Sequence, residues 1–277
     1  MLRALFIAVF FFTMTPLLIT AQWLVSKLGL PGWGLIAAFY YRVLCALLRI
    51  HVHVVGHPVR DRPVLLVSNH VSWADILVIG SVMPVAFVAK REVGDWPLVG
   101  AAARLQRTVF VDRARRHQTA ATIAQIVDRM AEGIPVVLFA EGTSSDGNRV
   151  LPFRTALIGA VRDACAHTKI GKSALIQPMS ICYVGTQGLP MGRQHRHLVA
   201  WYGALEFVPH FKEFIERTAV DAVVTFGEAF PAEGAPDRKE LAKSLESSVR
   251  RLTAATLRGR TPRKDKAQGK PAVNPAG

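Results

Sequence analysis

From about residue 52, short apolar runs rich in β-branched residues alternate with helical patterns, and this alternation constrains the fold more than any other feature of the sequence. Strands that alternate with helices are typical of a mostly parallel sheet covered by helices on its faces. The predicted strands are residues 63–68, 85–89, 108–111, 134–140, 174–181 and 219–226. We therefore predict an α/β domain over residues 51–256 with a mixed, mostly parallel sheet.

Two segments of this domain have the three- and four-residue apolar spacing of amphipathic helices. They are residues 118–131 and residues 237–252. Asp237, followed by Glu240 three residues later, forms a capping-box-like start for the second helix.

The N-terminal 50 residues are apolar enough to meet a membrane. Residues 4–25 are almost wholly uncharged and reach the length that crosses a bilayer as a helix. A turn follows at residues 27–32, and a second apolar stretch covers residues 32–50. We predict a membrane-associated helical hairpin that either dips into one leaflet or spans the bilayer. A hairpin buried in the protein core is the alternative.

The formal net charge of +14 over 277 residues implies an anionic partner. Nucleic acid, a phospholipid surface and a phosphorylated substrate all meet that description. The apolar N-terminus favours the phospholipid membrane, and no basic run interleaved with aromatic residues indicates a nucleic-acid face. Residues 257–277 form a basic tail that we predict to be disordered, and it either adds to membrane attachment or is only a solvated end.

The cysteine and histidine spacings argue against a metal site. The three cysteines are odd in number and form no C-x-x-C pair, so reduced cytosolic thiols are the simple interpretation. His51, His53 and His57 lie close together in sequence but lack partner ligands at a suitable spacing. We predict no metal.

His70 and Asp75 are the first candidates for chemistry. A predicted strand ends at Ser68 and a helical pattern begins near Trp73, so His70 lies on a strand-to-helix turn, where α/β proteins favour catalytic groups. If Asp75 lies in the first helical turn, it can hold one ring nitrogen of His70 and leave the other free to accept a proton. The alternative is a structural histidine beside an aspartate that the helix dipole stabilises.

Two further segments offer binding groups. Lys90 follows one predicted strand and Arg113 follows the next, and an arginine at a strand end suits a phosphate. Glu141 and Gly142 follow the strand at residues 134–140, where the glycine allows a close backbone approach and the carboxylate can bind hydroxyl groups or an arginine. Alone, the first pattern is also that of a solvated basic face, and the second that of an ordinary turn.

In this order, the segments resemble the glycerolipid acyltransferases, whose best-known members act on 1-acyl-glycerol-3-phosphate. The resemblance covers roughly residues 60–185. The first family block, N-H-x-S-x-x-D, is matched by Asn69, His70, Ser72 and Asp75, and the second, G-x-x-F-I-x-R, by Phe110, Val111 and Arg113. The third block, E-G-T-R-S, is matched by Glu141, Gly142, Thr143 and Ser145. The fourth is a proline after a strand, which Pro178 matches.

The chain departs from the family pattern at three positions. Arg107 replaces a glycine of the second block, Ser144 replaces the arginine of the third, and Arg154 replaces a lysine that follows Pro-Phe. These positions lie where the family binds the phosphate of the acyl acceptor. The departures therefore concern the identity of the acceptor more than the chemistry.

The resemblance implies that His70, oriented by Asp75, deprotonates the free hydroxyl of a lysolipid, which then attacks the thioester of acyl-CoA or acyl carrier protein. It implies no metal, cofactor or covalent acyl-enzyme. Arg113, with Lys90 as a weaker candidate, would hold the head group. The other substrate-binding candidates are Ser72, Glu141, Gly142, Thr143 and Pro178.

The expected acceptor is lysophosphatidic acid, which gives phosphatidic acid, and another lysolipid such as lyso-ornithine lipid is the alternative. The expected location is the inner membrane, with the active site facing the cytoplasm. A hypothesis of another class is a non-catalytic protein that binds anionic membranes through its basic surface.

Overall fold

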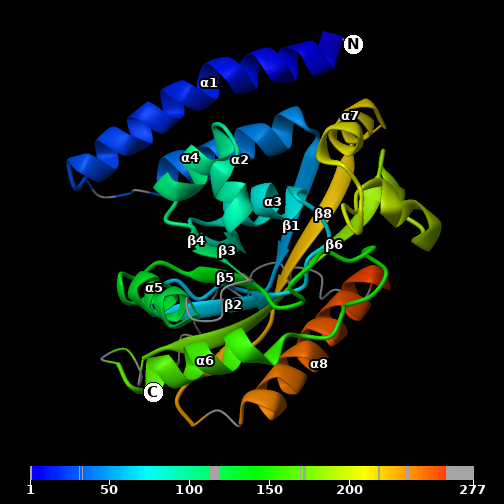
Figure 1. The fold of residues 1–277 in the computed structure, drawn as a ribbon. Helices are drawn as coiled ribbons and strands as arrows, with labels where there is room; N and C mark the ends of the chain where they lie inside the picture. Colours follow the sequence, from blue (N-terminus) through cyan, green and yellow to red (C-terminus); the bar gives the residue numbers. More distant parts are fainter. Residues whose placement is uncertain are drawn as a thin grey trace, which may run out of the picture.

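A computed structural model describes residues 2–30, 32, 34–112, 119–168, 170, 173–217, 219–234 and 237–259 of the chain. Arg113 and most of the predicted basic tail, residues 260–277, lie outside the described residues. The described chain forms a nine-stranded sheet with helices on both faces (Figure 1).

The sheet is mixed and mostly parallel, as the sequence predicts. Its main path runs β1-β8-β6-β2-β5-β3-β4, while β7 and β9 also pair with β6. The pairs along β6, β2, β5, β3 and β4 are parallel, whereas β7, β8 and β9 run antiparallel to β6. The strands are β1 (Ile50–Val55), β2 (Val64–Ser68), β3 (Ala86–Lys90), β4 (Val109–Val111), β5 (Val136–Phe139), β6 (Leu175–Thr186), β7 (Leu189–Pro190), β8 (Val220–Phe226) and β9 (Phe230–Pro231).

Helices cover both faces of this sheet. In Figure 1, α2 and α3 lie above the sheet and α6 and α8 lie below it; α7 packs into the core of the first face and α5 into the core of the second. The helices are α1 (Leu2–Lys27), α2 (Leu35–Leu47), α3 (Ala74–Val82), α4 (Val99–Leu105), α5 (Thr119–Ala131), α6 (Thr155–Ala166), α7 (Phe207–Arg217) and α8 (Arg238–Leu257).

Strand β2 shows why the sheet is buried on both faces. Successive side chains of a strand point to opposite faces. Val64 and Leu66 join the core beneath α3, whereas Leu65 and Val67 join the core beneath α5 and α8. An uninterrupted apolar run is the pattern expected of such a central parallel strand, and it places the end of β2 in the middle of the molecule.

Two strand boundaries differ from the prediction. The predicted apolar stretch 32–50 ends in β1, because Ile50 already pairs with Val220 of β8. The alternation of the exposed His51 and His53 with buried and half-buried residues is itself a strand pattern, but it directly continues the apolar stretch before it, and the prediction does not separate the two. Strand β6 continues to Thr186, beyond the predicted end at residue 181, because its pairing with β8 extends past the end of β2.

The helices at residues 118–131 and 237–252 are confirmed as α5 and α8. The Asp237 carboxylate caps α8 by accepting hydrogen bonds from the backbone N–H groups of Lys239 and Glu240. Helices α4, α6 and α7 have no predicted counterpart. In α6, small residues weaken the apolar spacing, and α7 contains Pro209, which its first turn tolerates.

The N-terminal segment forms two helices, α1 and α2, that contact each other. Within α1, Leu5–Lys27 is long and apolar enough to cross a membrane by length and composition. The N-terminal end of α1 is bound to the rest of the protein, because Arg3 donates hydrogen bonds to the carbonyls of Leu47 and Ile215. Helix α2 packs on α3, where a Cβ added to Gly80 would overlap the ring of Tyr41. The second helix of the hairpin is therefore also part of the α/β core.

Candidate active site

The site begins where β2 ends, at Asn69. The last paired residue of β2 is Ser68, opposite Met179 of β6. The buried Asn69 side chain then donates to the carbonyl of Ile181 and accepts from its N–H, at 2.9 Å each. The amide thus replaces the backbone of a continued strand, so the main chain turns away from the sheet at His70 without leaving Ile181 unpaired.

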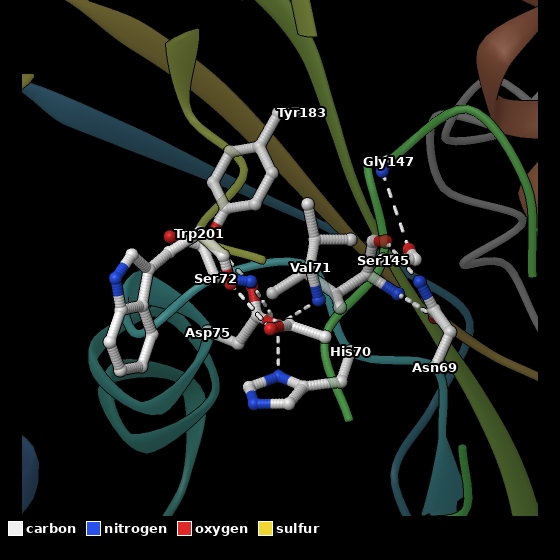
Figure 2. A network of polar contacts seen from close by, with 11 residues as sticks. Asn69, His70, Val71, Ser72, Asp75, Ser145, Gly147, Tyr183 and Trp201 are labelled. Carbon is white, nitrogen blue, oxygen red and sulfur yellow. Dashed lines mark hydrogen bonds and ion pairs between the residues drawn. The ribbon is translucent and has the colours of Figure 1, made fainter. Parts of the chain in front are cut away.

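His70 and Asp75 meet across this turn, as the spacing predicts for an aspartate in the first helical turn. His70 Nδ1 lies 2.7 Å from Asp75 Oδ2, and Asp75 belongs to the first turn of α3 (Figure 2). Asp75 Oδ2 also accepts hydrogen bonds from the backbone N–H groups of Val71 and Ser72, at 2.7 and 3.1 Å. The turn and the carboxylate therefore fix each other.

The arrangement determines which nitrogen of His70 can act. A carboxylate only accepts hydrogen bonds, so Nδ1 carries the ring proton and Nε2 is left as an acceptor. The ring of Phe139 stacks on the imidazole at 4.1 Å and holds its plane. The His70 side chain is 21% exposed while that of Asp75 is fully buried, so a substrate can reach the base but not its partner.

Tyr183 of β6 is a member of the site that sequence analysis does not find. Its hydroxyl donates to Asp75 Oδ1 at 2.7 Å, so both carboxylate oxygens have donors (Figure 2). Burial, followed by the negative charge of Asp75, raises the pKa of Tyr183 well above its ordinary value. No spacing rule links residues 108 positions apart, and this tyrosine also lies beyond the predicted end of its strand.

Glu141 lies directly behind the turn between β2 and α3 that carries His70. Its Oε1 accepts a hydrogen bond from the N–H of Leu151 at 3.2 Å, and the His70 N–H also interacts with the carboxyl group. Burial, together with the nearby charge of Asp75, raises the pKa of Glu141 to about 8, although the two backbone donors and the charge of Arg250 oppose the shift. The carboxyl group is therefore mostly protonated at neutral pH.

The loop after β5 supports the turn through its backbone and its small side chains. The N–H of Ser145 donates to the His70 carbonyl at 2.8 Å, and the hydroxyl of Ser144 donates to the Trp201 carbonyl. Gly142 adopts a positive φ of 72°, and Arg154 packs so closely that an added Cβ would lie 2.9 Å from its Nε. Glycine is needed here, while the predicted Thr143 points to solvent as an exposed residue.

The remaining predicted residues lie around this centre. The Ser72 hydroxyl is buried and has no hydrogen-bond partner among the residues that the structure describes. Lys90 is exposed at the end of β3, and Arg113 lies outside the described residues. Pro178 is buried in β6 opposite Val67, and its carbonyl accepts from the N–H of Gly227. The substrate-binding roles of these residues stay predictions.

The chemistry of the side chains suits a general base. Within the described ranges, no group of three or more His, Cys, Asp or Glu residues is placed to hold a metal ion. A neutral, oriented imidazole beside a buried carboxylate can take a proton from a hydroxyl group and stabilise the resulting imidazolium.

Comparison with known proteins identifies the family of the chain. The family model described as Acyltransferase matches residues 49–182, which include the turn, the loop after β5 and most of β6. The lyso-ornithine lipid O-acyltransferase of Brucella abortus is 45% identical over 88% of this chain and 91% of its own length. The protein of the same name from Rhizobium meliloti is 43% identical over 84% and 79%.

A solved structure shares the fold. The 1-acyl-sn-glycerophosphate (LPA) acyltransferase PlsC from Thermotoga maritima superimposes with a TM-score of 0.65 over 92% of this chain and 93% of its own. The sequence identity is 20%, so the likeness concerns the fold alone. The sequence similarity of the relatives over most of their length carries the assignment: the chain belongs to the acyltransferase family that includes these enzymes.

Proposed function

We propose that this protein is an O-acyltransferase that esterifies the free hydroxyl of lyso-ornithine lipid. The observation that carries the proposal is the set of most similar relatives, since four of them bear the name lyso-ornithine lipid O-acyltransferase. Two of them are more than 40% identical to this chain over at least 84% of its length.

In the proposed reaction, Nε2 of His70 accepts the proton of the acceptor hydroxyl. The oxygen forms a bond to the thioester carbonyl carbon of acyl-CoA or acyl carrier protein, and the carbon–sulfur bond breaks. The imidazolium, stabilised by Asp75, returns its proton to the leaving thiolate. Every atom is accounted for without a protein nucleophile, a metal or a cofactor.

Ser144 supports an acceptor without a phosphate. Ornithine is an amino acid, so its head group presents carboxylate and ammonium groups. The arginine that the family pattern places at this position suits a phosphate because it donates two hydrogen bonds at once. Here the position holds Ser144, whose hydroxyl already donates to the Trp201 carbonyl. This side chain therefore offers neither the charge nor the fork of an arginine.

The membrane is the proposed source of the acceptor. Helix α1 is the segment that suits insertion, because its described side chains include several exposed apolar residues. The net charge of +14 suits an anionic phospholipid surface. We propose the inner membrane as the location, with the site facing the cytoplasm, where acyl-CoA and acyl carrier protein supply the acyl group.

The test is acyl transfer by the purified full-length protein in phospholipid vesicles. Each acyl donor is paired in turn with lyso-ornithine lipid and with lysophosphatidic acid. His70→Ala should lower the rate roughly 10²- to 10⁴-fold, whereas His51→Ala, at an exposed site on β1, should not change it. A His70→Ala protein that keeps most of the wild-type rate contradicts the mechanism. Vesicle binding without any acyl transfer supports the non-catalytic alternative instead.

Lysophosphatidic acid is the second candidate acceptor. The 1-acyl-sn-glycerol-3-phosphate acyltransferase of Neisseria gonorrhoeae is 36% identical to this chain, but over only 40% of it. The shared region is consistent with common chemistry rather than a common head group. A higher kcat/KM with lysophosphatidic acid than with lyso-ornithine lipid would decide for this candidate.

A further inference from the structure

The Asp75 carboxylate is fully buried, and the source of its donors is unusual. Oδ2 accepts from His70 and from two backbone N–H groups, all within the same turn. Oδ1 accepts from the hydroxyl of Tyr183, which reaches across from β6 (Figure 2). The catalytic pair is thus joined to the sheet by one side-chain hydroxyl that the family motifs do not contain.

We infer that Tyr183 is a positioning residue for the catalytic pair: its hydroxyl fixes the Asp75 carboxylate so that Oδ2 faces His70 Nδ1. The inference rests on the proposed acyl transfer. Tyr183 itself is 3% exposed and buried behind Asp75, so it acts through the pair and not on the substrate.

The position of Tyr183 follows from the alternation of β6. Met179, Ile181 and Tyr183 join the core on the α3 side of the sheet. Ser180 and Cys182 point the other way and interact with Thr253 of α8. The Tyr183 side chain therefore points to the face of the sheet that α3 covers. Tyr183 lies beyond the last residue of β6 that pairs with β2, at the level of the turn.

The ionisable groups around His70 and Asp75 explain why Asp75 needs the Tyr183 hydroxyl. The titratable groups that interact with Asp75 or with Tyr183 are His70, Glu141, Cys45 and Cys182. Burial raises the pKa of Glu141 to about 8 and that of the Cys182 thiol to about 11, so both are mostly neutral at pH 7. A buried carboxylate oxygen without a donor is strongly disfavoured, so Oδ1 depends on the Tyr183 hydroxyl.

Loss of the hydroxyl has two consequences. The carboxylate is then held only through Oδ2, by His70 and the backbone N–H groups of Val71 and Ser72, so its orientation varies more and fewer molecules hold His70 in the reactive orientation. Because Oδ1 has lost its donor, more of the negative charge is also directed at the imidazole, which favours the protonated ring. The first effect lowers kcat, and the second moves the acid limb of the rate profile to higher pH.

The test compares Tyr183→Phe with Tyr202→Phe, an exposed tyrosine, in the full-length protein in vesicles. Tyr183→Phe should lower kcat about 10- to 100-fold, the range for a lost hydrogen bond to a charged group, and leave the KM of the acceptor nearly unchanged. The acid limb should move up by several tenths of a pH unit. Tyr202→Phe should match the wild type in all three.

A purely structural role predicts a different result. Tyr183→Phe would then lower the melting temperature while the active fraction kept the wild-type acid limb, and that outcome overturns the inference. If the wild type acylates neither proposed acceptor, the proposed function fails. The downfield NMR signal of the His70 Nδ1–H proton then tests the positioning role independently of activity. The signal should be lost or shifted in Tyr183→Phe and kept in Tyr202→Phe, and an unchanged signal in Tyr183→Phe refutes the positioning role.

Discussion

The carboxyl group of Glu141 lies behind the turn that carries His70, and its raised pKa links the stability of the fold to pH. Burial raises its pKa to about 8 in the folded protein, whereas an unfolded glutamate titrates near ~4.3. Between these values the folded state binds a proton that the unfolded state has released. Stability should therefore be full below the lower value and decline as pH rises toward the higher one.

Glu141→Gln removes this dependence while keeping an acceptor for the N–H of Leu151. The wild type should lose up to about 1.4 kcal/mol of unfolding free energy per pH unit from pH 5 to 7.5 relative to the variant. Thermal unfolding of both proteins in the same detergent over that range measures the difference. Parallel stability curves for the two proteins would show that Glu141 is ionised in the folded state.

Ser144 is the residue at which the head-group preference can be changed. Ser144→Arg restores the cation of the family pattern and should raise the kcat/KM ratio of lysophosphatidic acid to lyso-ornithine lipid about tenfold or more, since charged hydrogen bonds contribute about 1.5–3 kcal/mol. Ser144→Ala is the matched control, because it loses the hydrogen bond to Trp201 without adding charge. Equal ratios in both variants would mean that this position does not read the head group.

Sequence spacing was enough to predict that His70 and Asp75 could meet, because both lie on one short turn. The blocks around Glu141 and Gly142 were also visible as motifs. Tyr183 was not, since its contact with Asp75 depends on the register of β6 against β2, which the local sequence does not encode. The contacts within the turn were therefore predictable, and the contact that Tyr183 of β6 makes with Asp75 was not.

At the scale of elements, the site depends on where β2 stops. Parallel pairing ends at Ser68, and the side chain of Asn69 provides the next donor and acceptor for β6. An aspartate would lack the donor and an alanine would lack both. The asparagine of the first motif thus ends the strand at a defined residue and lets the turn carry the base.

Asn69→Ala should leave the N–H and carbonyl of Ile181 without these partners in a buried position. We expect a loss of about 2–6 kcal/mol in unfolding free energy, since each of the two unsatisfied buried groups costs about 1–3 kcal/mol. Urea unfolding in detergent gives the value. Asn148→Ala, in a part-exposed loop, is the control and should cost less than about 1 kcal/mol. Similar losses for both would show that Asn69 is an ordinary polar residue.

Strong apolar patterns made the central strands and helices α5 and α8 predictable. Strand β1 alternates exposed histidines with apolar residues, as a half-buried strand should, but it follows an apolar helix so closely that the two were predicted as one stretch. Helix α7 has regular apolar spacing at Phe207, Phe211 and Phe214, but Pro209 in its first turn argues against a helix in the sequence. In the structure, Trp73 packs edge-on against Phe211 and Phe214. Such packing partners from a distant segment are not visible in the local sequence.

At the scale of the whole molecule, α1 lies along one end of the fold, where it contacts α2, α4 and α7 (Figure 1). Leu5, Phe6, Phe12 and Leu17 are each at least 60% exposed, whereas Ile7 and Thr15 are buried against the protein. A helix with apolar residues on both sides suits one face on protein and the other in lipid. The proposed orientation places the membrane on the outer side of α1.

Replacing Phe12 and Leu17 with aspartate tests this orientation. Full burial of one such side chain in an apolar phase contributes about 1.5–3 kcal/mol, so the double variant should bind anionic vesicles about 100-fold more weakly or worse. Its melting temperature in detergent should change little, because both positions are exposed. Leu189→Asp, at a 70% exposed leucine on β7, is the control and should bind like the wild type. Vesicle binding that survives the double change but disappears in high salt would assign attachment to the basic surface instead, because salt screens exposed charges but not apolar contacts.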